Sequence, residues 1–79
     1  MTTADDHRLE KHSVVIAGHR TSITLESVFW RALKGIAKES DQSISELVAE
    51  IDRVRGEHDP PPNLSSALRV FVLVEARSS

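Results

Sequence analysis

The stretch RTSITL, Arg20 to Leu25, limits what this chain can fold into more than any other. Apolar and polar side chains alternate along it, with one face made of Thr21, Ile23 and Leu25 and the other of Arg20, Ser22 and Thr24. A repeat of two residues is the period of a β-strand. A single strand cannot satisfy its own backbone hydrogen-bonding groups, so a second strand must lie beside it. The identity of that second strand decides the fold.

Two amphipathic helices are predicted directly after this strand. Between Ser27 and Glu39, apolar side chains recur at spacings of three and four residues, which is the helical period. The sequence SISE, Ser43 to Glu46, has the form of a capping box and begins a second helix that runs to about Arg55. The intervening residues 40–43 form a turn by composition.

The flanking segments are less regular. Residues 1–10 are polar and predicted to be a disordered tail, while Ser13–Ala17 is apolar and β-branched and is expected to be extended, with a bend or bulge at Gly18. A connector over residues 57–63 contains three consecutive prolines and ends the second helix. Residues 64–77 follow a helical stripe from a cap at Asn63, which favours a helix, although VFVLV alone would suit a strand.

These elements predict a ribbon domain over residues 11–56 that is completed by a second copy. The strand pairs antiparallel with its own copy, and the helices of both chains cover one face of the ribbon. The expected fold is mainly α, with a short N-terminal β-ribbon, an intertwined homodimer and an extra C-terminal helix packed on the dimer. The predicted dimer core consists of Ile23, Leu25, Phe29, Leu33, Ile36, Leu47, Val48 and Ile51.

Composition excludes several classes of protein. The chain has 79 residues, a net charge of −2 and no cysteine, so disulfides and thiolate metal sites are excluded. No apolar run approaches the roughly 20 residues of a membrane span, and a cytoplasmic protein without cofactor is expected. The four histidines are not spaced as metal ligands, so no metal is expected. Without a nucleophile motif or paired carboxylates, an enzyme is not expected either.

At this point the segment from Arg20 to about Arg55 resembles the ribbon-helix-helix proteins of the MetJ and Arc repressor type. More closely, HSVVIAGHRTSITLE, FWRALKGIA and NLSSALRVFVL look like short, uncharacterised bacterial members with this domain, a match that extends from His12 to Leu73. The resemblance implies a ribbon-helix-helix fold, with Asp41 at the left-handed position of the turn between the two helices. In that fold the outward strand residues read base edges in the major groove, and the start of the second helix binds a phosphate.

Carried onto this chain, the resemblance implies a sequence-specific regulator of transcription, a repressor, that binds double-stranded DNA. The base-reading residues would be Arg20, Ser22 and Thr24. The phosphate-binding residues would be Ser43, Ile44 and Ser45 at the helix start, together with His19 and Lys11. Arg20 is the strongest reader among them, because a guanidinium can form a bidentate pair with guanine.

One alternative function stays open. The apolar tail from Leu64 to Val74 and the proline connector would also suit a dimeric or tetrameric protein-interaction module. Such a module would resemble an antitoxin, in which the C-terminal segment binds another protein. The tail could instead pack on the helices of its own dimer or link two dimers into a tetramer.

Overall fold

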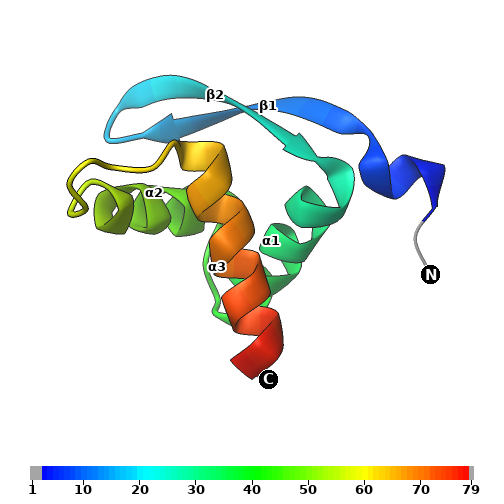
Figure 1. Ribbon diagram of the computed structural model, residues 1–79. Helices are drawn as coiled ribbons and strands as arrows, with labels where there is room; N and C mark the ends of the chain where they lie inside the picture. The colour runs from blue at the N-terminus through cyan, green and yellow to red at the C-terminus, as the bar shows by residue number, and fades with distance from the viewer. Residues whose placement is uncertain (1–2, 79) are drawn as a thin grey trace.

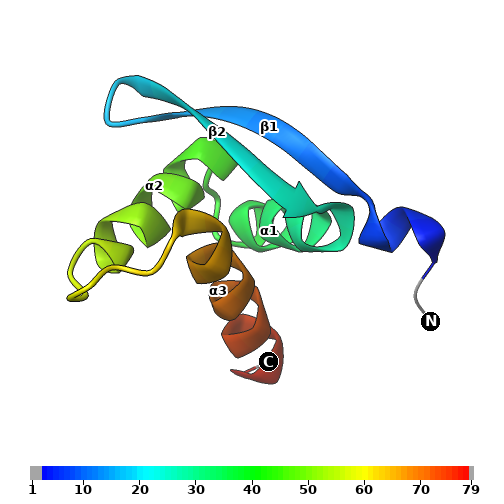
Figure 2. The ribbon, with the colours of Figure 1, turned by 45° about the horizontal axis from the view of Figure 1, so that its top comes forward.

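The computed structural model describes residues 3–78 and consists of a β-hairpin lying across three helices (Figure 1). Strands β1 (Leu9–Ile16) and β2 (His19–Glu26) form the hairpin, and α1 (Ser27–Glu39) follows β2 without a loop. Helices α2 (Ile44–Arg55) and α3 (Leu64–Ser78) complete the chain. All three helices lie on one side of the hairpin, as the turned view in Figure 2 also shows. The structure therefore has one covered sheet face and one open face.

The partner of the alternating strand is β1 of the same chain. The two strands run antiparallel in a register from Leu9 opposite Glu26 to Ile16 opposite His19. Our expectation that a second copy supplies this strand is thus wrong for the hairpin, because residues 9–16 provide a partner for every residue of β2. Intertwining of two copies is not needed to complete the ribbon, and it stays a prediction.

The hairpin closes through a two-residue turn at Ala17 and Gly18. Both residues have positive φ angles, 51° and 81°, which defines a type I′ turn. Such a turn matches the twist of the two strands and favours glycine or asparagine. Gly18 meets this demand, whereas Ala17 holds a left-handed conformation that costs an L-residue roughly 1–2 kcal/mol. The bend expected at Gly18 is therefore the tip of the hairpin.

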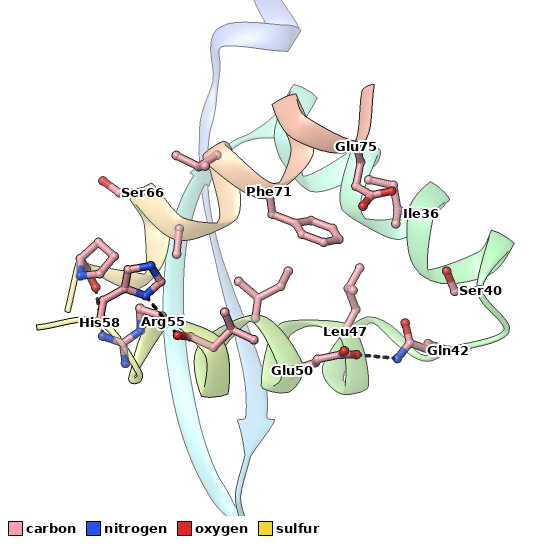
Figure 3. A pocket seen from close by; sticks show the side chains of 15 residues that line it. Ile36, Ser40, Gln42, Leu47, Glu50, Arg55, His58, Ser66, Phe71 and Glu75 are labelled. Carbon is pink, nitrogen blue, oxygen red and sulfur yellow. Dashed lines mark hydrogen bonds between the residues drawn. The ribbon is translucent and has the colours of Figure 1, made fainter. Parts of the chain in front are cut away.

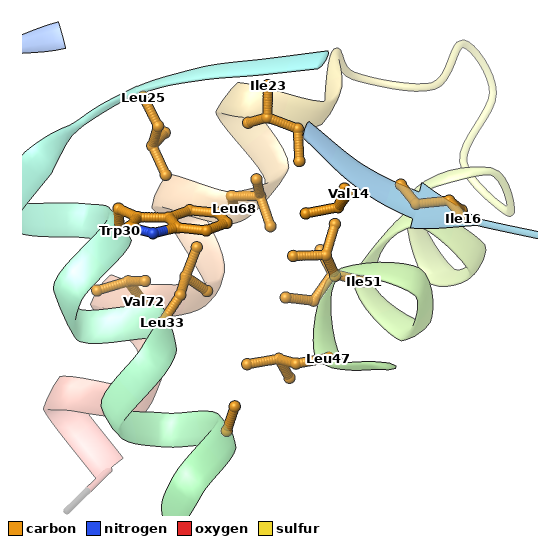
Figure 4. Close-up of a cluster of buried hydrophobic side chains, with 12 residues drawn as sticks. Val14, Ile16, Ile23, Leu25, Trp30, Leu33, Leu47, Ile51, Leu68 and Val72 are labelled. Carbon is orange, nitrogen blue, oxygen red and sulfur yellow. The ribbon is translucent and has the colours of Figure 1, made fainter. Parts of the chain in front are cut away.

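The inner face of the hairpin forms one core with all three helices (Figure 4). Of the predicted core residues, six are buried within a single chain: Ile23, Leu25, Leu33, Leu47, Val48 and Ile51. Phe29 and Ile36 are partly buried and pack against this core. The core also includes residues that the sequence did not single out for it: Val14, Ile16, Trp30, Ala37, Leu68 and Val72.

His12 joins the hairpin to α1 through an aromatic contact. Its ring stacks on Trp30 with 3.9 Å between the ring centroids and 8° between the planes. The His12 Nε2 atom is buried and lies 3.4 Å from the Glu10 carboxylate, without hydrogen-bond geometry. The stacked rings cover part of the inner face in the first half of β1, where Glu10 and His12 are half-buried and no aliphatic side chain points inward.

The turn between α1 and α2 is a Schellman motif. The Asp41 and Gln42 backbone N–H groups donate to the carbonyls of Lys38 and Ala37, at 3.2 and 2.8 Å. Asp41 has a φ of 55°, which confirms the left-handed position expected for it. The capping box at Ser43 and Glu46 is also present and begins α2. These two local signals end α1 and begin α2.

Residues 64–78 are helical, which resolves the ambiguity of the apolar tail. Leu68 and Val72 of α3 point into the core. The Ser65 hydroxyl donates to the Thr24 carbonyl at 3.0 Å, and the Arg69 guanidinium binds both oxygens of the Glu26 carboxylate. Helix α3 is thereby tied to the end of β2 and belongs to the same structural unit as the ribbon.

The N-terminal segment is ordered from Thr3 onward, unlike the disordered tail predicted for residues 1–10; residues 1 and 2 lie outside the described part. A 3₁₀ turn, η1 (Ala4–His7), packs on the start of α1. The Ser27 backbone N–H donates to the Arg8 carbonyl at 2.8 Å, and its hydroxyl bonds the Asp5 carbonyl. These contacts bury Ser27 at the first position of α1, whereas Val28 beside it is 40% exposed.

Candidate nucleic-acid interface

The open face of the hairpin carries side chains from both strands. Residues directly opposite each other in a sheet share a face, so the register defines this surface. Three of its cross-strand pairs are Lys11 with Thr24, Ser13 with Ser22 and Val15 with Arg20, and all six residues are exposed. The fourth pair, Leu9 with Glu26, lies at the far end of the hairpin. We call these six residues the outer face.

The outer face carries two cations that residues 3–78 do not neutralise. In this part of the chain, neither Lys11 nor Arg20 makes a salt bridge, whereas Arg8, Arg31 and Arg69 each pair with a carboxylate. Glu26 lies at the far end of β2, but Arg69 holds its carboxylate. The hydrogen bond from Arg69 lowers the pKa of Glu26 and keeps this pair ionised. The outer face is therefore locally basic although the chain is acidic.

The start of α2 lies in the helical layer behind the hairpin (Figure 1). Its capping box uses the backbone N–H groups of Ser43 and Glu46, which bind the Glu46 carboxylate at 2.8 Å and the Ser43 hydroxyl at 3.0 Å. The N–H groups of Ile44 and Ser45 therefore remain as candidate phosphate donors. The Ser43 N–H lowers the pKa of the Glu46 carboxyl, so this helix start already holds an anionic group.

The predicted site residues are divided among three places. Arg20, Ser22 and Thr24 share the outer face with Lys11, as their alternation predicted. His19 is exposed beside the turn, but it pairs with Ile16 and so belongs to the opposite face from Arg20. The helix start at residues 43–45 lies in the helical layer and contributes no side chain to the outer face.

Of the three β1 residues on this surface, sequence reasoning named Lys11 but missed Ser13 and Val15. Ser13 and Val15 stand opposite Ser22 and Arg20. The extended segment Ser13–Ala17 was visible in the sequence, and pairing it across Gly18 would have assigned both residues to the outer face. The structure thus doubles the width of the candidate interface.

Residues 3–78 contain neither a cluster of metal-ligating side chains nor a helix that could span a membrane. No group of three or more histidine, aspartate or glutamate side chains there could hold a metal ion. Within the same residues, no helix has the length and apolar character to cross a bilayer.

A two-stranded ribbon with an open face is also the element that β-ribbon DNA-binding proteins place in a groove. A family model, "Ribbon-helix-helix domain", matches residues 9–76. The chain therefore belongs to the ribbon-helix-helix family, as the resemblance implied. Domains of this family are generally dimeric and DNA-binding, and they are typically regulatory rather than enzymatic.

A solved structure supports the same assignment. The chain is similar to an uncharacterized protein from Bordetella pertussis Tohama I, with a TM-score of 0.76 and 29% sequence identity. The similarity covers 91% of this chain and 58% of that protein, so the chain spans less than two thirds of its length. The comparison with curated proteins found no match.

Proposed function

We propose that this protein is a sequence-specific regulator of transcription, acting as a repressor, that inserts its hairpin into the major groove of double-stranded DNA. The observation that carries the proposal is the outer face, which combines the cations of Lys11 and Arg20 with hydroxyl groups on an exposed two-stranded ribbon. A two-stranded ribbon fits the major groove, which presents a distinct pattern of hydrogen-bonding groups for each base pair. The helices behind the ribbon hold it rigid.

In this mechanism the side chains of the outer face have different roles. Arg20 donates two hydrogen bonds to guanine, and Ser22 and Thr24 provide less selective contacts to neighbouring base edges. Val15 lies opposite Arg20 and offers an apolar surface to a thymine methyl group. Lys11 lies opposite Thr24, and its long flexible side chain reaches a phosphate at the edge of the groove.

Further phosphate contacts come from outside the outer face. A phosphate oxygen is attracted to the start of α2 by the backbone N–H groups of Ile44 and Ser45 and by the positive end of the helix dipole. Ser43 stabilises this helix start as its N-cap. His19, beside the turn, contacts a phosphate at the opposite end of the ribbon. These contacts position the ribbon, whereas the outer face supplies the selectivity.

The first experiment identifies the DNA that the protein binds. The purified protein is incubated with sheared genomic DNA at physiological salt, and the retained fragments are sequenced. Enrichment of fragments that share a motif supports the proposal. The absence of any enriched motif contradicts it and favours the protein-interaction alternative.

The second experiment tests whether Arg20 contacts and distinguishes a base. Arg20→Ala is expected to weaken binding to an enriched fragment by about 1–3 kcal/mol and to relax the preference for one base. Arg53→Ala is the matched control, because it removes the same charge from an exposed position on α2, where Arg53 pairs with Glu57. Equal losses in the two variants, measured by fluorescence anisotropy, would show that only bulk charge matters.

The third experiment tests the role of Lys11. Loss of a phosphate contact lowers the slope of log K against log salt by about 0.9. Lys11→Ala should therefore reduce the salt dependence without changing which fragments are enriched. A changed motif with an unchanged salt slope would instead make Lys11 a base reader.

A further inference from the structure

The cross-strand pair nearest the turn differs in chemistry from the other two pairs of the outer face. Val15 lies directly opposite Arg20, and it is the only apolar residue among the six. Its side chain is 54% exposed. The other two pairs combine hydroxyl groups with one lysine. A valine beside a cation thus occupies the end of the outer face that lies next to the turn.

The backbone fixes the direction in which these two side chains point. Val14 and Ile16 are 4% and 9% exposed and pack into the core, so Val15 between them points to the open face. The two-residue turn sets the register that places Arg20 opposite Val15. The β-carbons of such a pair lie about 4.5–5.5 Å apart, and a branched valine side chain has few rotamers. The pair therefore presents an apolar surface and a guanidinium side by side.

Neighbouring base pairs in the major groove offer groups that match this pair. A guanidinium binds O6 and N7 of guanine, and a small apolar side chain contacts the C5-methyl group of thymine. Successive base pairs are about 3.4 Å apart along the helix axis, so two adjacent side chains reach two adjacent base pairs. Within residues 3–78, no carboxylate forms a salt bridge with Arg20. Its guanidinium can therefore bind guanine without first breaking an ion pair.

We propose that Val15 and Arg20 together recognise a pyrimidine that carries a 5-methyl group next to a guanine. The methyl group lies against Val15, and the guanine binds Arg20. A valine side chain neither donates nor accepts hydrogen bonds, so it does not distinguish the O4 atom of thymine from the amino group of cytosine. Cytosine methylated at C5 presents the same methyl group as thymine. The pair therefore accepts 5-methylcytosine, and methylation of a cytosine beside the guanine strengthens binding.

This recognition rests on the proposed function, because the hairpin must enter the major groove for either side chain to reach a base. It adds a regulatory input to that function, since the methylation state of the DNA sets the affinity of the site. The sequence motif enriched from genomic DNA is expected to contain thymine or methylated cytosine next to a guanine. A motif without such a step overturns the recognition by Val15 and Arg20 and leaves the proposed function standing. The absence of any motif contradicts both.

Replacing single thymines of an enriched fragment by uracil tests the methyl contact. Uracil keeps the hydrogen-bonding groups of thymine and lacks only its methyl group. The affinity measured by fluorescence anisotropy is expected to fall about fourfold at the thymine beside the guanine, which corresponds to the burial of one methyl-sized group. Equal affinities for the thymine and uracil duplexes at this position would overturn the proposal.

Two valine variants show which residue makes the contact. Val70 is 61% exposed, similar to Val15, but it lies on α3 in the helical layer and lines a groove between α2 and α3. Figure 3 shows this groove, with Phe71 pointing from α3 toward α2. Val15→Ala should abolish the preference for thymine over uracil, whereas Val70→Ala should keep it at about fourfold. This preference is a ratio for one protein and so does not depend on how much of a variant is folded. A preference that survives Val15→Ala would overturn the assignment to Val15.

A methylated duplex tests the regulatory consequence. Cytosine replaces the contacted thymine, opposite guanine, and the duplex is prepared with and without the 5-methyl group on this cytosine. The parent protein should bind the methylated duplex about fourfold more tightly than the unmethylated one. Val15→Ala should bind both duplexes equally, and Val70→Ala should behave as the parent does. Equal affinities of the parent protein for the two duplexes would overturn recognition of 5-methylcytosine.

Discussion

Replacing Leu68 with alanine measures whether α3 belongs to the core or is an appendage. Leu68 has 0% exposure and lies among the side chains of the hairpin and the other helices. Removing a fully buried leucine side chain usually costs about 2–5 kcal/mol, because a cavity remains after the transfer energy is lost. A chain of 79 residues has a total stability of roughly 4–12 kcal/mol. Leu68→Ala should therefore remove a large fraction of the stability of the whole protein.

The matched control lies further along the same helix. Leu73 is 58% exposed, so Leu73→Ala makes the same chemical change with the same effect on helix propensity but opens no cavity. Its expected cost is within about 0.5 kcal/mol. The difference between the two variants isolates the contribution of burial.

Urea unfolding followed by two signals provides the assay. Trp30 is 8% exposed and stacked on His12, so its fluorescence reports the junction of hairpin and α1, and far-ultraviolet circular dichroism reports all helices. Both signals should give one transition, shifted to lower urea in Leu68→Ala with an unchanged slope. The urea titrations are made at a protein concentration at which the parent chain and both variants have the same mass in solution. A cost below about 1 kcal/mol, or loss of helix before the fluorescence change, would refute the view that α3 completes the core.

Three further predictions concern local features. Ala17→Asn should stabilise the protein by up to about 1 kcal/mol, since asparagine tolerates the left-handed turn position, and should raise the Tm in calorimetry by roughly 4–8 °C per kcal/mol; a lower Tm would contradict the turn assignment. The pKa of Glu26 is lowered from its ordinary value of 4.5 in the folded state. The ionised carboxylate therefore stabilises the fold at pH values above 4.5, and this contribution is lost as the pH falls below 4.5. Glu26→Gln should thus flatten the decline of stability in acid, and an unchanged decline in urea titrations would argue against the pair with Arg69. Glu46→Gln retains the capping box and removes a negative charge from the start of α2. The variant should therefore bind DNA more tightly in anisotropy measurements, because a phosphate at this helix start is no longer repelled. An unchanged affinity would argue against a phosphate contact at the start of α2.

The helices were predictable because their signals are local. The capping box at Ser43, the left-handed position at Asp41 and the regular apolar spacing in residues 27–39 each depend on neighbours within a few positions. Tertiary contacts reinforce these preferences without replacing them. The same holds for Ile23 and Leu25, whose burial follows from the alternation of β2.

The partner strand was missed because the first half of β1 carries little of the usual strand signal. Glu10 and His12 occupy inward positions in its first half, where an apolar residue would be expected. The burial of His12 depends on stacking with Trp30, a contact between distant parts of the chain that no local pattern reveals. The turn has alanine at a position where asparagine or glycine would have indicated a hairpin.

The candidate site was predicted only as far as β2 extends. Alternation placed Arg20, Ser22 and Thr24 on one face, and the structure agrees. Ser13 and Val15 join this face only when the segment Ser13–Ala17 is paired with β2 across Gly18, a step that the sequence interpretation did not take. The position of the α2 start relative to the ribbon depends on helix packing, which the sequence pattern does not specify.

A ribbon made by one chain has a consequence for the DNA sequence that it would read. When two copies each give one strand, both strands are identical and the ribbon matches a palindrome. Here one strand presents Lys11, Ser13 and Val15 and the other presents Arg20, Ser22 and Thr24, so the reading surface has a direction. Under the proposed function, each hairpin would recognise a non-palindromic element. Repeats of that element in the genome would then mark where individual chains bind.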